Sequence, residues 1–306
     1  MTRQFAEENL RGKKKARDAH AAYFANWAGE RAQWNERASF AVMTKDFENA
    51  RAAWMWAGEQ KDAASLSRLV HFSKRYLDIQ GRYREGYDLM ERALKDSNAP
   101  DKADDSPLDE RGQLIARLWT YKALFMGDLG RSDETAPILE ACLTYFRRTG
   151  DKLQIMACLN ALGITQRFIG NEEKAADYFR AQLEIARELK NRHEEATALN
   201  NLCTAMNVME NFIQAEQMLK ECLVIRRELN DEAGISSTLI NLGVALFNQG
   251  RDAEVKPLLY EAIEISRRIN QPRNLAGALG NLGGIFKREG QYEEALKLFM
   301  QGLETH

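Results

Sequence analysis

A strict 40-residue period runs through the C-terminal two-thirds of this 306-residue chain. The stretch "NLGVALFNQG", Asn241 to Gly250, returns as "NLGGIFKREG", Asn281 to Gly290. A short loop recurs at the same interval, at Gly130-Arg131, Gly170-Asn171, Glu210-Asn211, Gly250-Arg251 and Gly290-Gln291. Such a period is typical of proteins whose units stack on one another, because one small unit cannot bury its own apolar face.

Within each period, large and small residues return at fixed places. Before the loop, a large residue precedes a small one by four positions, in the pairs Trp119/Ala123, Leu159/Gly163, Leu199/Cys203, Leu239/Gly243 and Leu279/Gly283. Residues at i and i+4 share one helix face, and a small residue there lets another helix approach closely. After the loop, a second amphipathic pattern carries Thr135/Leu139, Ala175/Phe179, Ala215/Leu219, Val255/Leu259 and Ala295/Phe299. Each unit is therefore predicted to be two antiparallel helices, with a glycine supplying the positive φ between them.

These columns resemble the tetratricopeptide repeat (TPR). The shared pattern is a large residue, then Leu-Gly, a turn glycine, and Ala-x-x-x-Phe-x-x-Ala-Leu, here with 40 residues per unit where the short form has ~34. The resemblance covers five repeats over residues 111–306, the last of them truncated, and it departs where Cys203 or Glu210 replaces a glycine. It implies an all-α fold, a right-handed superhelical solenoid of antiparallel helix pairs in which the first helices line a concave groove.

The N-terminal third divides into three predicted segments. Residues 66–94 follow the same pattern and are expected to form a divergent first repeat, with Gly81 in the turn. Residues 95–110, "KDSNAPDKADDSPLDE", lack periodicity and are expected to be a loop or linker. Residues 1–65 form an aromatic-rich helical segment that includes Trp27, Trp34, Phe40, Phe47 and Trp54. Aromatic residues at helical spacing favour a core, with a ligand cage as the alternative.

A second resemblance concerns the order of four blocks in residues 3–94: "RQFAEENL", "HAAYFANWAGE", "FENARAAWMWAGEQKD" and "GRYREGYDLMERAL". This order is similar to the junction between the winged-helix end and the TPR arm of bacterial STAND-class signalling ATPases, such as LuxR-like and antibiotic-regulator-like activators. In those proteins an NTPase module precedes this junction. Its phosphate-binding motif, G-x-x-x-x-G-K-[ST], does not occur in these 306 residues, so the resemblance implies an upstream NTPase module in the parent protein. We expect a sensor arm, with a free-standing protein as the alternative.

Several function classes lack support in the sequence. A net charge of −2, from 43 basic and 45 acidic residues, does not favour direct binding to nucleic acid or to an acidic membrane. No stretch approaches 18 apolar residues, and four cysteines without C-x-x-C spacing favour a reducing, cytoplasmic setting. The glycines of "GALGNLGG" fall in helix columns, and "HEEAT" has Thr197 where a zinc-protease helix needs histidine. We expect no enzyme, no cofactor and no metal.

The candidate site is the groove lined by the first helices. Polar and aromatic residues flank the Leu-Gly columns at Asn160, Arg167, Asn200, Asn201, Asn207, Asn241, Phe247, Asn248, Asn281, Lys287 and Arg288. Similar TPR receptors use such asparagines for the backbone of an extended peptide and such cations for its carboxylates. An amide offers a donor and an acceptor, which suits a peptide backbone. The alternative interpretation is that these amides bond neighbouring helices or water. We expect a non-catalytic sensor for a protein, a peptide or a small-molecule effector; a TPR scaffold or co-chaperone-like adaptor is the alternative function.

Overall fold

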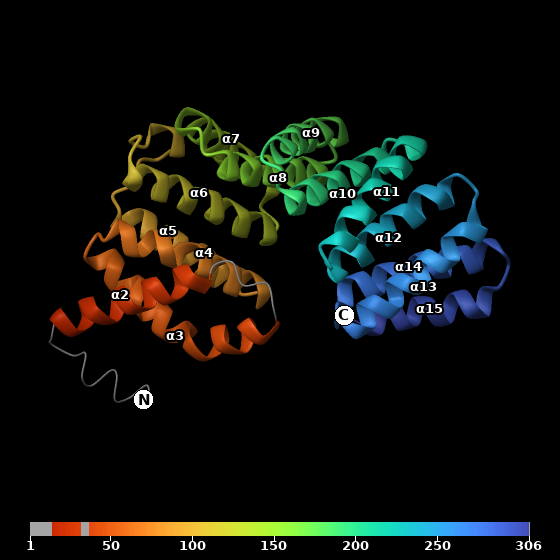
Figure 1. Ribbon diagram of the computed structural model, residues 1–306, viewed down its shortest axis with the longest axis horizontal. Coiled ribbons are helices and arrows are strands. Elements are labelled where there is room, and N and C mark those ends of the chain that lie inside the picture. Colours follow the sequence, from red (N-terminus) through yellow and green to blue (C-terminus); the bar gives the residue numbers. More distant parts are fainter. Residues whose placement is uncertain (1–13, 32–36, 306) are drawn as a thin grey trace. The chain divides into compact units, whose positions relative to one another are not determined.

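The structure is a computed structural model that describes residues 14–31 and 37–305, with side chains described for residues 14–30 and 44–305. Trp34 and Phe40, which belong to the predicted aromatic-rich segment, lie outside the described side chains. Nearly all of the described chain is α-helical, and no strand occurs in it (Figure 1). The predicted all-α fold class, built from consecutive antiparallel helix pairs, is confirmed.

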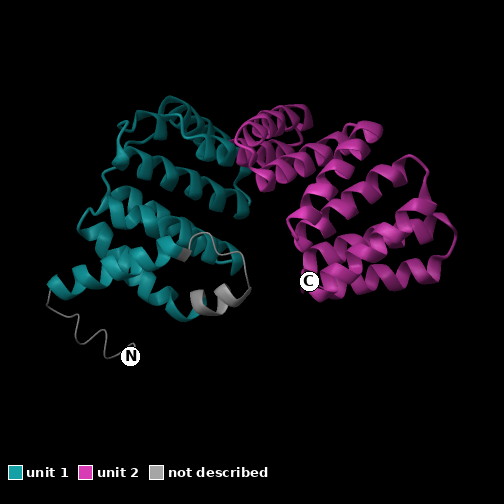
Figure 2. Ribbon diagram, in the orientation of Figure 1, with its two compact units in different colours: residues 1–158 teal, residues 159–306 magenta. Residues whose placement is uncertain are grey.

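The chain divides into two compact units, residues 1–158 and 159–306, and the division falls inside α8 (Figure 2). The elements that lie in unit 1 are α2 (Lys14–Arg31), α3 (Arg37–Glu59), α4 (Ala63–Ile79), α5 (Tyr83–Asp96), the short 3-10 helix η1 (Ala103–Asp105), α6 (Glu110–Asp128) and α7 (Ser132–Thr149). After α8 (Lys152–Ile169), unit 2 contains α9 (Glu172–Glu188), α10 (Arg192–Val208), α11 (Phe212–Glu228), α12 (Glu232–Asn248), α13 (Asp252–Arg268), α14 (Pro272–Arg288) and α15 (Tyr292–Glu304). The finer boundaries expected at residues 65, 94 and 110 stay predictions.

The helices of the array begin and end where the repeat predicts. The first helices α10, α12 and α14 each start 40 residues after the one before, and so do the second helices α11, α13 and α15. Asn191 and Asp231 cap their helices, because each side chain accepts a hydrogen bond from the backbone N–H three residues later. The turn between the two helices of a unit has a positive φ in every repeat, including the one where Glu210 (φ 61°) replaces glycine.

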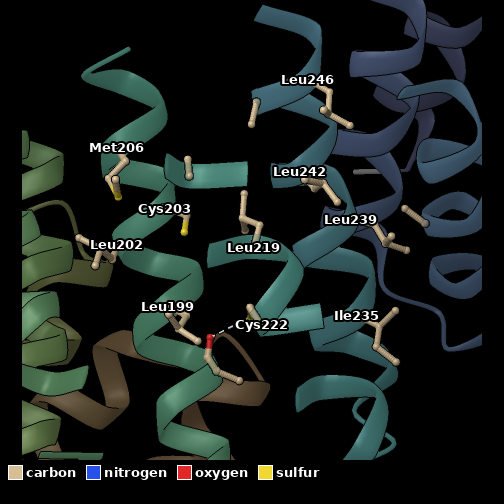
Figure 3. Close-up of a cluster of buried hydrophobic side chains, with 14 of the residues drawn as sticks. Leu199, Leu202, Cys203, Met206, Leu219, Cys222, Ile235, Leu239, Leu242 and Leu246 are labelled. Atoms are coloured by element: carbon tan, nitrogen blue, oxygen red, sulfur yellow. Dashed lines mark hydrogen bonds between the residues drawn. The ribbon is translucent and has the colours of Figure 1, made fainter. Parts of the chain in front are cut away.

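The repeated columns form the core of unit 2. Figure 3 shows Leu199 and Cys203 of α10 facing Leu219 and Cys222 of α11, with Leu239 of α12 beyond them. All five side chains are fully buried. Because each column returns in each unit, the same contacts recur along the array and one continuous core results.

Small residues in these columns are required by close packing. A Cβ placed on Gly163 would lie 2.4 Å from the Phe179 ring, and one on Gly283 would lie 2.8 Å from the Phe299 ring. The column differs at Trp119: the leucines that share its column are buried, whereas Trp119 is only half-buried. Trp119 therefore shares the column of those leucines but not their burial. Its indole borders a pocket beside the aperiodic segment that precedes α6.

Aromatic side chains fill the core of unit 1. This is what their helical spacing predicts, in preference to a ligand cage. Trp27 packs edge-on against Phe72 of α4, and Phe47 stacks on Tyr76 at a centroid distance of 4.0 Å. Trp54 is also buried. Trp56 instead lies near the surface, where its indole N–H donates to Asp18 at 2.9 Å. These contacts assign the aromatic residues named here to packing between helices α2, α3 and α4.

The segment between α5 and α6 is fastened to the helices around it. Tyr145 donates to the Pro107 carbonyl at 2.8 Å, and Arg148 donates to the Asp104 carbonyl at 2.8 Å. Ala103 is buried in the same place. This loop therefore has a defined position over α6 and α7, even though its sequence has no periodicity.

Ion pairs also follow the 40-residue period. Arg187 pairs with Glu221 at 2.8 Å, and the equivalent pair one repeat later joins Arg227 and Glu261 at 2.9 Å. A second set joins the start of a first helix to the end of its second helix, as Arg192–Glu228 at 3.0 Å and Glu232–Arg268 at 2.8 Å. In this second set the positive charge lies on the first helix in one repeat and on the second helix in the next. Such exposed pairs contribute ~1 kcal/mol or less each to stability.

Candidate binding face on the first helices of unit 2

The candidate site lies on the side of α8, α10, α12 and α14 that the leucine and glycine columns do not use. One column of this side carries Asn201, Asn241 and Asn281, all half-buried. Positions three and seven residues later lie on the same helix face, and the position six residues later, that of Arg167, Asn207, Phe247 and Lys287, borders it. We call the surface formed by these columns the binding face. It is the face that the sequence assigns to ligand contact.

Two of its asparagine pairs connect neighbouring first helices. Asn201 Nδ2 donates to Asn160 Oδ1 at 2.8 Å. Asn241 Nδ2 donates to Asn200 Oδ1 and to Thr204 Oγ1, both at 3.1 Å. These hydrogen bonds join neighbouring helices, which is the alternative role that the sequence analysis gave to the asparagines. Asn160, Asn201 and Asn241 are half-buried and keep further donor or acceptor capacity, whereas Asn200 is buried and its Oδ1 also accepts from Thr238 at 3.5 Å.

Other predicted residues near the C-terminal ends of the first helices also have protein partners. Asn207 Nδ2 donates to the Asn241 carbonyl at 3.2 Å, and its buried Oδ1 has no partner among the described residues. Asn248 donates to a carbonyl of its own helix at 2.9 Å. Arg167 pairs with Glu172 at 3.3 Å. These three side chains are held in place by the protein itself.

Phe247 and Arg288 form a stacked pair across α12 and α14. The Arg288 guanidinium lies 3.5 Å from the Phe247 ring centroid, donates to the Phe247 carbonyl at 3.1 Å, and pairs with Asp252. This arrangement combines a cation–π contact with an ion pair. It fixes both side chains at one end of the binding face.

Asn281 and Lys287 differ from the rest of the set. Neither side chain makes a hydrogen bond or ion pair with any residue in the described part of the chain. Asn281 is half-buried and Lys287 is exposed. They are the members of the predicted set with the most capacity for a ligand.

Apolar residues on the same face were missed by the sequence reasoning. Ile164 is 37% exposed, Phe168 73% and Val208 59%. Phe168 and Val208 occupy the column that holds Asn248 and Arg288 in later repeats, so the period could have identified them. Together these exposed apolar side chains make the part of the face on α8 and α10 apolar.

The remaining chemistry of the described chain favours packing. All four cysteines are buried. Burial raises the pKa of the Cys158 thiol to about 12 and raises that of Cys203 as well, so both stay protonated at neutral pH. The described residues contain no group of three His, Cys, Asp or Glu side chains placed to hold a metal ion. The glycine-rich stretch at residues 277–284 lies inside α14.

Comparisons with known proteins bear on the fold and the family. The model of the tetratricopeptide repeat matches residues 114–188, 194–268 and 234–306. No curated protein sequence matches. None of the described helices combines the length and apolar character needed to cross a membrane.

Three solved structures share the fold at low sequence identity. The apo form of RapI has a TM-score of 0.71 at 13% identity, over 93% of this chain and 97% of that chain. Bacillus thuringiensis PlcR in complex with the peptide PapR7 and DNA has a TM-score of 0.52 at 16% identity, over 68% and 71%. Aspartyl phosphate phosphatase F from Bacillus subtilis has a TM-score of 0.59 at 9% identity, over 89% and 76%. At these identities the likeness shows the fold alone.

Proposed function

The chain belongs to the tetratricopeptide repeat family, and we propose that it binds an extended segment of a peptide or protein along the binding face without catalysing a reaction. The observation that carries this proposal is the placement of Asn281 and Lys287, two polar groups without protein partners among the described residues, on the face that also exposes Phe168 and Val208. Free amide, cation and apolar contacts on one face are what an extended peptide requires.

The length of the face suggests the size of the ligand. From α8 to α14 there are three steps between neighbouring first helices of about 10 Å each, so the face spans about 30 Å. An extended chain advances about 3.3 Å per residue, which corresponds to roughly nine residues. Such a segment could place apolar side chains near Phe168 and Val208 and a carboxylate near Lys287.

The likeness to PlcR, which was solved with a peptide, supports a peptide ligand. The likeness to aspartyl phosphate phosphatase F transfers no activity, because a shared fold does not carry a shared reaction. The binding face offers amides, cations and apolar groups, which hold a ligand but do not by themselves pair a nucleophile with a base.

A random-peptide display library provides the test. Enriched peptides should bind the purified chain saturably, and Asn281→Ala and Lys287→Ala should each weaken binding about tenfold, with an unchanged melting temperature. Lys297→Ala, on the second helix of the same repeat, is the matched control and should bind normally. Equal affinity for all four proteins would place the ligand elsewhere and refute the proposed face.

We also propose that this binding serves as the sensor of a STAND-type regulator. The support is the order of sequence blocks in residues 3–94, which resembles the junction between the winged-helix end and the TPR arm of those ATPases. The reading frame of the gene ahead of residue 1 tests this step. A phosphate-binding loop of the form G-x-x-x-x-G-K-[ST] encoded in frame would support the sensor, whereas a start site with no such module would favour a free-standing scaffold.

A further inference from the structure

The last described helix, α15, carries an apolar stripe that is exposed along its length. Among the described helices, α15 packs on α14 alone (Figure 1). Tyr292, Leu296, Phe299 and Leu303 follow one another at intervals of four, three and four residues, which places them on one helix face. All four are exposed, and Leu303 reaches 76%. An exposed apolar stripe of this kind marks an interaction site.

The same columns are buried elsewhere in the array. The column of Phe299 holds Leu259 in α13, and the column of Leu303 holds Ile263, which are 0% and 6% exposed. α13 packs on both α12 and α14, whereas α15 has a described neighbour on one side only. α15 therefore exposes columns that the array elsewhere buries.

The stripe on α15 also differs from the faces that another repeat covers. The column of Leu296 holds alanine in α7 and α9, Glu216 in α11 and Lys256 in α13. Glu216 pairs with Arg251 at 2.7 Å and Lys256 pairs with Glu289 at 2.7 Å, and both partners belong to the repeat that follows. A leucine cannot form such a pair and is larger than alanine. The stripe on α15 therefore favours an apolar partner over one more unit of the same array.

The stripe is complementary to itself when two helices run antiparallel. In that arrangement Leu296 meets the partner's Phe299, and Tyr292 meets the partner's Leu303, because both pairs are centred on the same point of the helix. A two-fold axis repeats each contact, so that one helix from each copy builds a continuous apolar seam. Alternating steps of four and three residues are the spacing by which helices pack in coiled coils.

The carboxylates of α15 do not oppose this pairing. Glu294 pairs with Lys297 at 2.8 Å within the helix, and both lie away from the stripe. Glu293 is level with the partner's Gly302, and Glu304 is level with the partner's Gln291. Neither carboxylate meets another across the seam, so the seam contains no repulsion between like charges.

We propose that a second copy of this chain covers α15, in a two-fold dimer whose α15 helices run antiparallel. One helix from each copy buries less than the roughly 800 Å² per partner of a standard interface, so the association is reversible and depends on protein concentration. The dimer uses a second helix, whereas the peptide of the proposed function uses the first helices. The two proposals therefore stand or fall separately.

Sedimentation velocity of the full chain across a wide range of protein concentration tests the dimer. We expect a shift from monomer to dimer as the concentration rises. Leu296→Glu and Leu303→Glu should each weaken dimerisation at least tenfold, with an unchanged circular dichroism spectrum, because both side chains are exposed in the single chain. Val224→Glu is the matched control, since it places the same charge on an exposed apolar site of α11, and it should dimerise normally.

A mixture of two variants tests the antiparallel orientation. Tyr292→Lys and Leu303→Glu should each self-associate more weakly than the wild type. Mixed together they should recover dimers, because the new ammonium then meets the new carboxylate while the second Tyr292–Leu303 contact stays intact.

Three results would overturn the proposal. A monomer at every concentration would exclude a second copy as the occupant of the stripe. Dimers that persist in Leu296→Glu and Leu303→Glu would place the contact elsewhere on the chain. A mixture of Tyr292→Lys and Leu303→Glu that stays monomeric would refute the antiparallel seam.

Discussion

The glycine column makes a quantitative prediction at Gly163. Alanine is favoured over glycine inside a helix by about 1 kcal/mol. At Gly163, however, the added Cβ would lie 2.4 Å from Phe179 Cε1, about 1 Å closer than two carbon atoms normally approach. The Phe179 ring is fully buried, so it cannot turn out to solvent, and protein interiors are close-packed. Overpacking of this kind costs about 3 kcal/mol at its upper range, so Gly163→Ala should lower the free energy of unfolding by about 2 kcal/mol.

Two other glycines provide matched controls. A Cβ on Gly284 would have no neighbour within 4 Å, so Gly284→Ala should raise stability by up to about 1 kcal/mol. A Cβ on Gly283 would lie 2.8 Å from the Phe299 ring, but that ring is 37% exposed and can turn outward. Gly283→Ala should therefore be close to neutral. The expected order of stability is Gly284→Ala, then wild type and Gly283→Ala, then Gly163→Ala.

Urea unfolding followed by circular dichroism gives the global stability. Hydrogen exchange of the α8 and α9 amides gives a local value, which matters because repeat arrays need not unfold in one step. Phe179→Leu in the Gly163→Ala background should recover part of the loss, since the smaller side chain removes the overlap. If Gly163→Ala proves as stable as Gly284→Ala, the close-packing account of this column is wrong.

Two further predictions concern Glu216 and Glu210. Burial alone would raise the pKa of Glu216, but hydrogen bonds from Lys220, Gln249 and Arg251 lower it to about 2. Since the folded-state pKa is below the unfolded value of about 4.3, this stabilisation of about 3 kcal/mol is complete above about pH 5 and is lost as the pH falls toward 2. Urea titrations across this range should show a flatter acid limb for Glu216→Gln than for wild type; equal slopes would contradict the assignment. Glu210→Gly should raise the melting temperature by removing about 1 kcal/mol of left-handed strain, and a drop would show that Glu210 has another role.

The repeat made most of the fold predictable. A leucine column that returns at a fixed interval is buried in the same way each time, so the period alone places Leu199 and Leu239 in the core, where both are fully buried. The exception at Trp119 arises because the aperiodic loop beside it belongs to no column. Periodicity carries no information on where such a loop packs.

The period predicts which helix face carries the asparagine columns, but it does not predict the hydrogen bonds that these asparagines make. The period compares residues 40 apart, whereas the asparagine bonds join Asn160 to Asn201 and Asn200 to Asn241, which are 41 apart. Neighbouring first helices meet through adjacent columns, so the partner of each amide lies one column away from its repeat equivalent. Side chains such as Asn281, which bond no described residue, are therefore distinguished from bonded ones only by the packed geometry.

The exchange of sign between Arg192–Glu228 and Glu232–Arg268 has a consequence for folding. Similar neighbouring repeats can mispair, with the first helix of one unit docking on the second helix of the next. Such a slip would bring Arg192 against Arg268 and leave Glu232 against Glu228. Each native pair contributes little to stability, yet the slipped arrangement replaces two attractions with two repulsions. The ion pairs thus distinguish one helix hairpin from the next. They favour packing of each first helix on its own second helix over packing on the equivalent helix one repeat away.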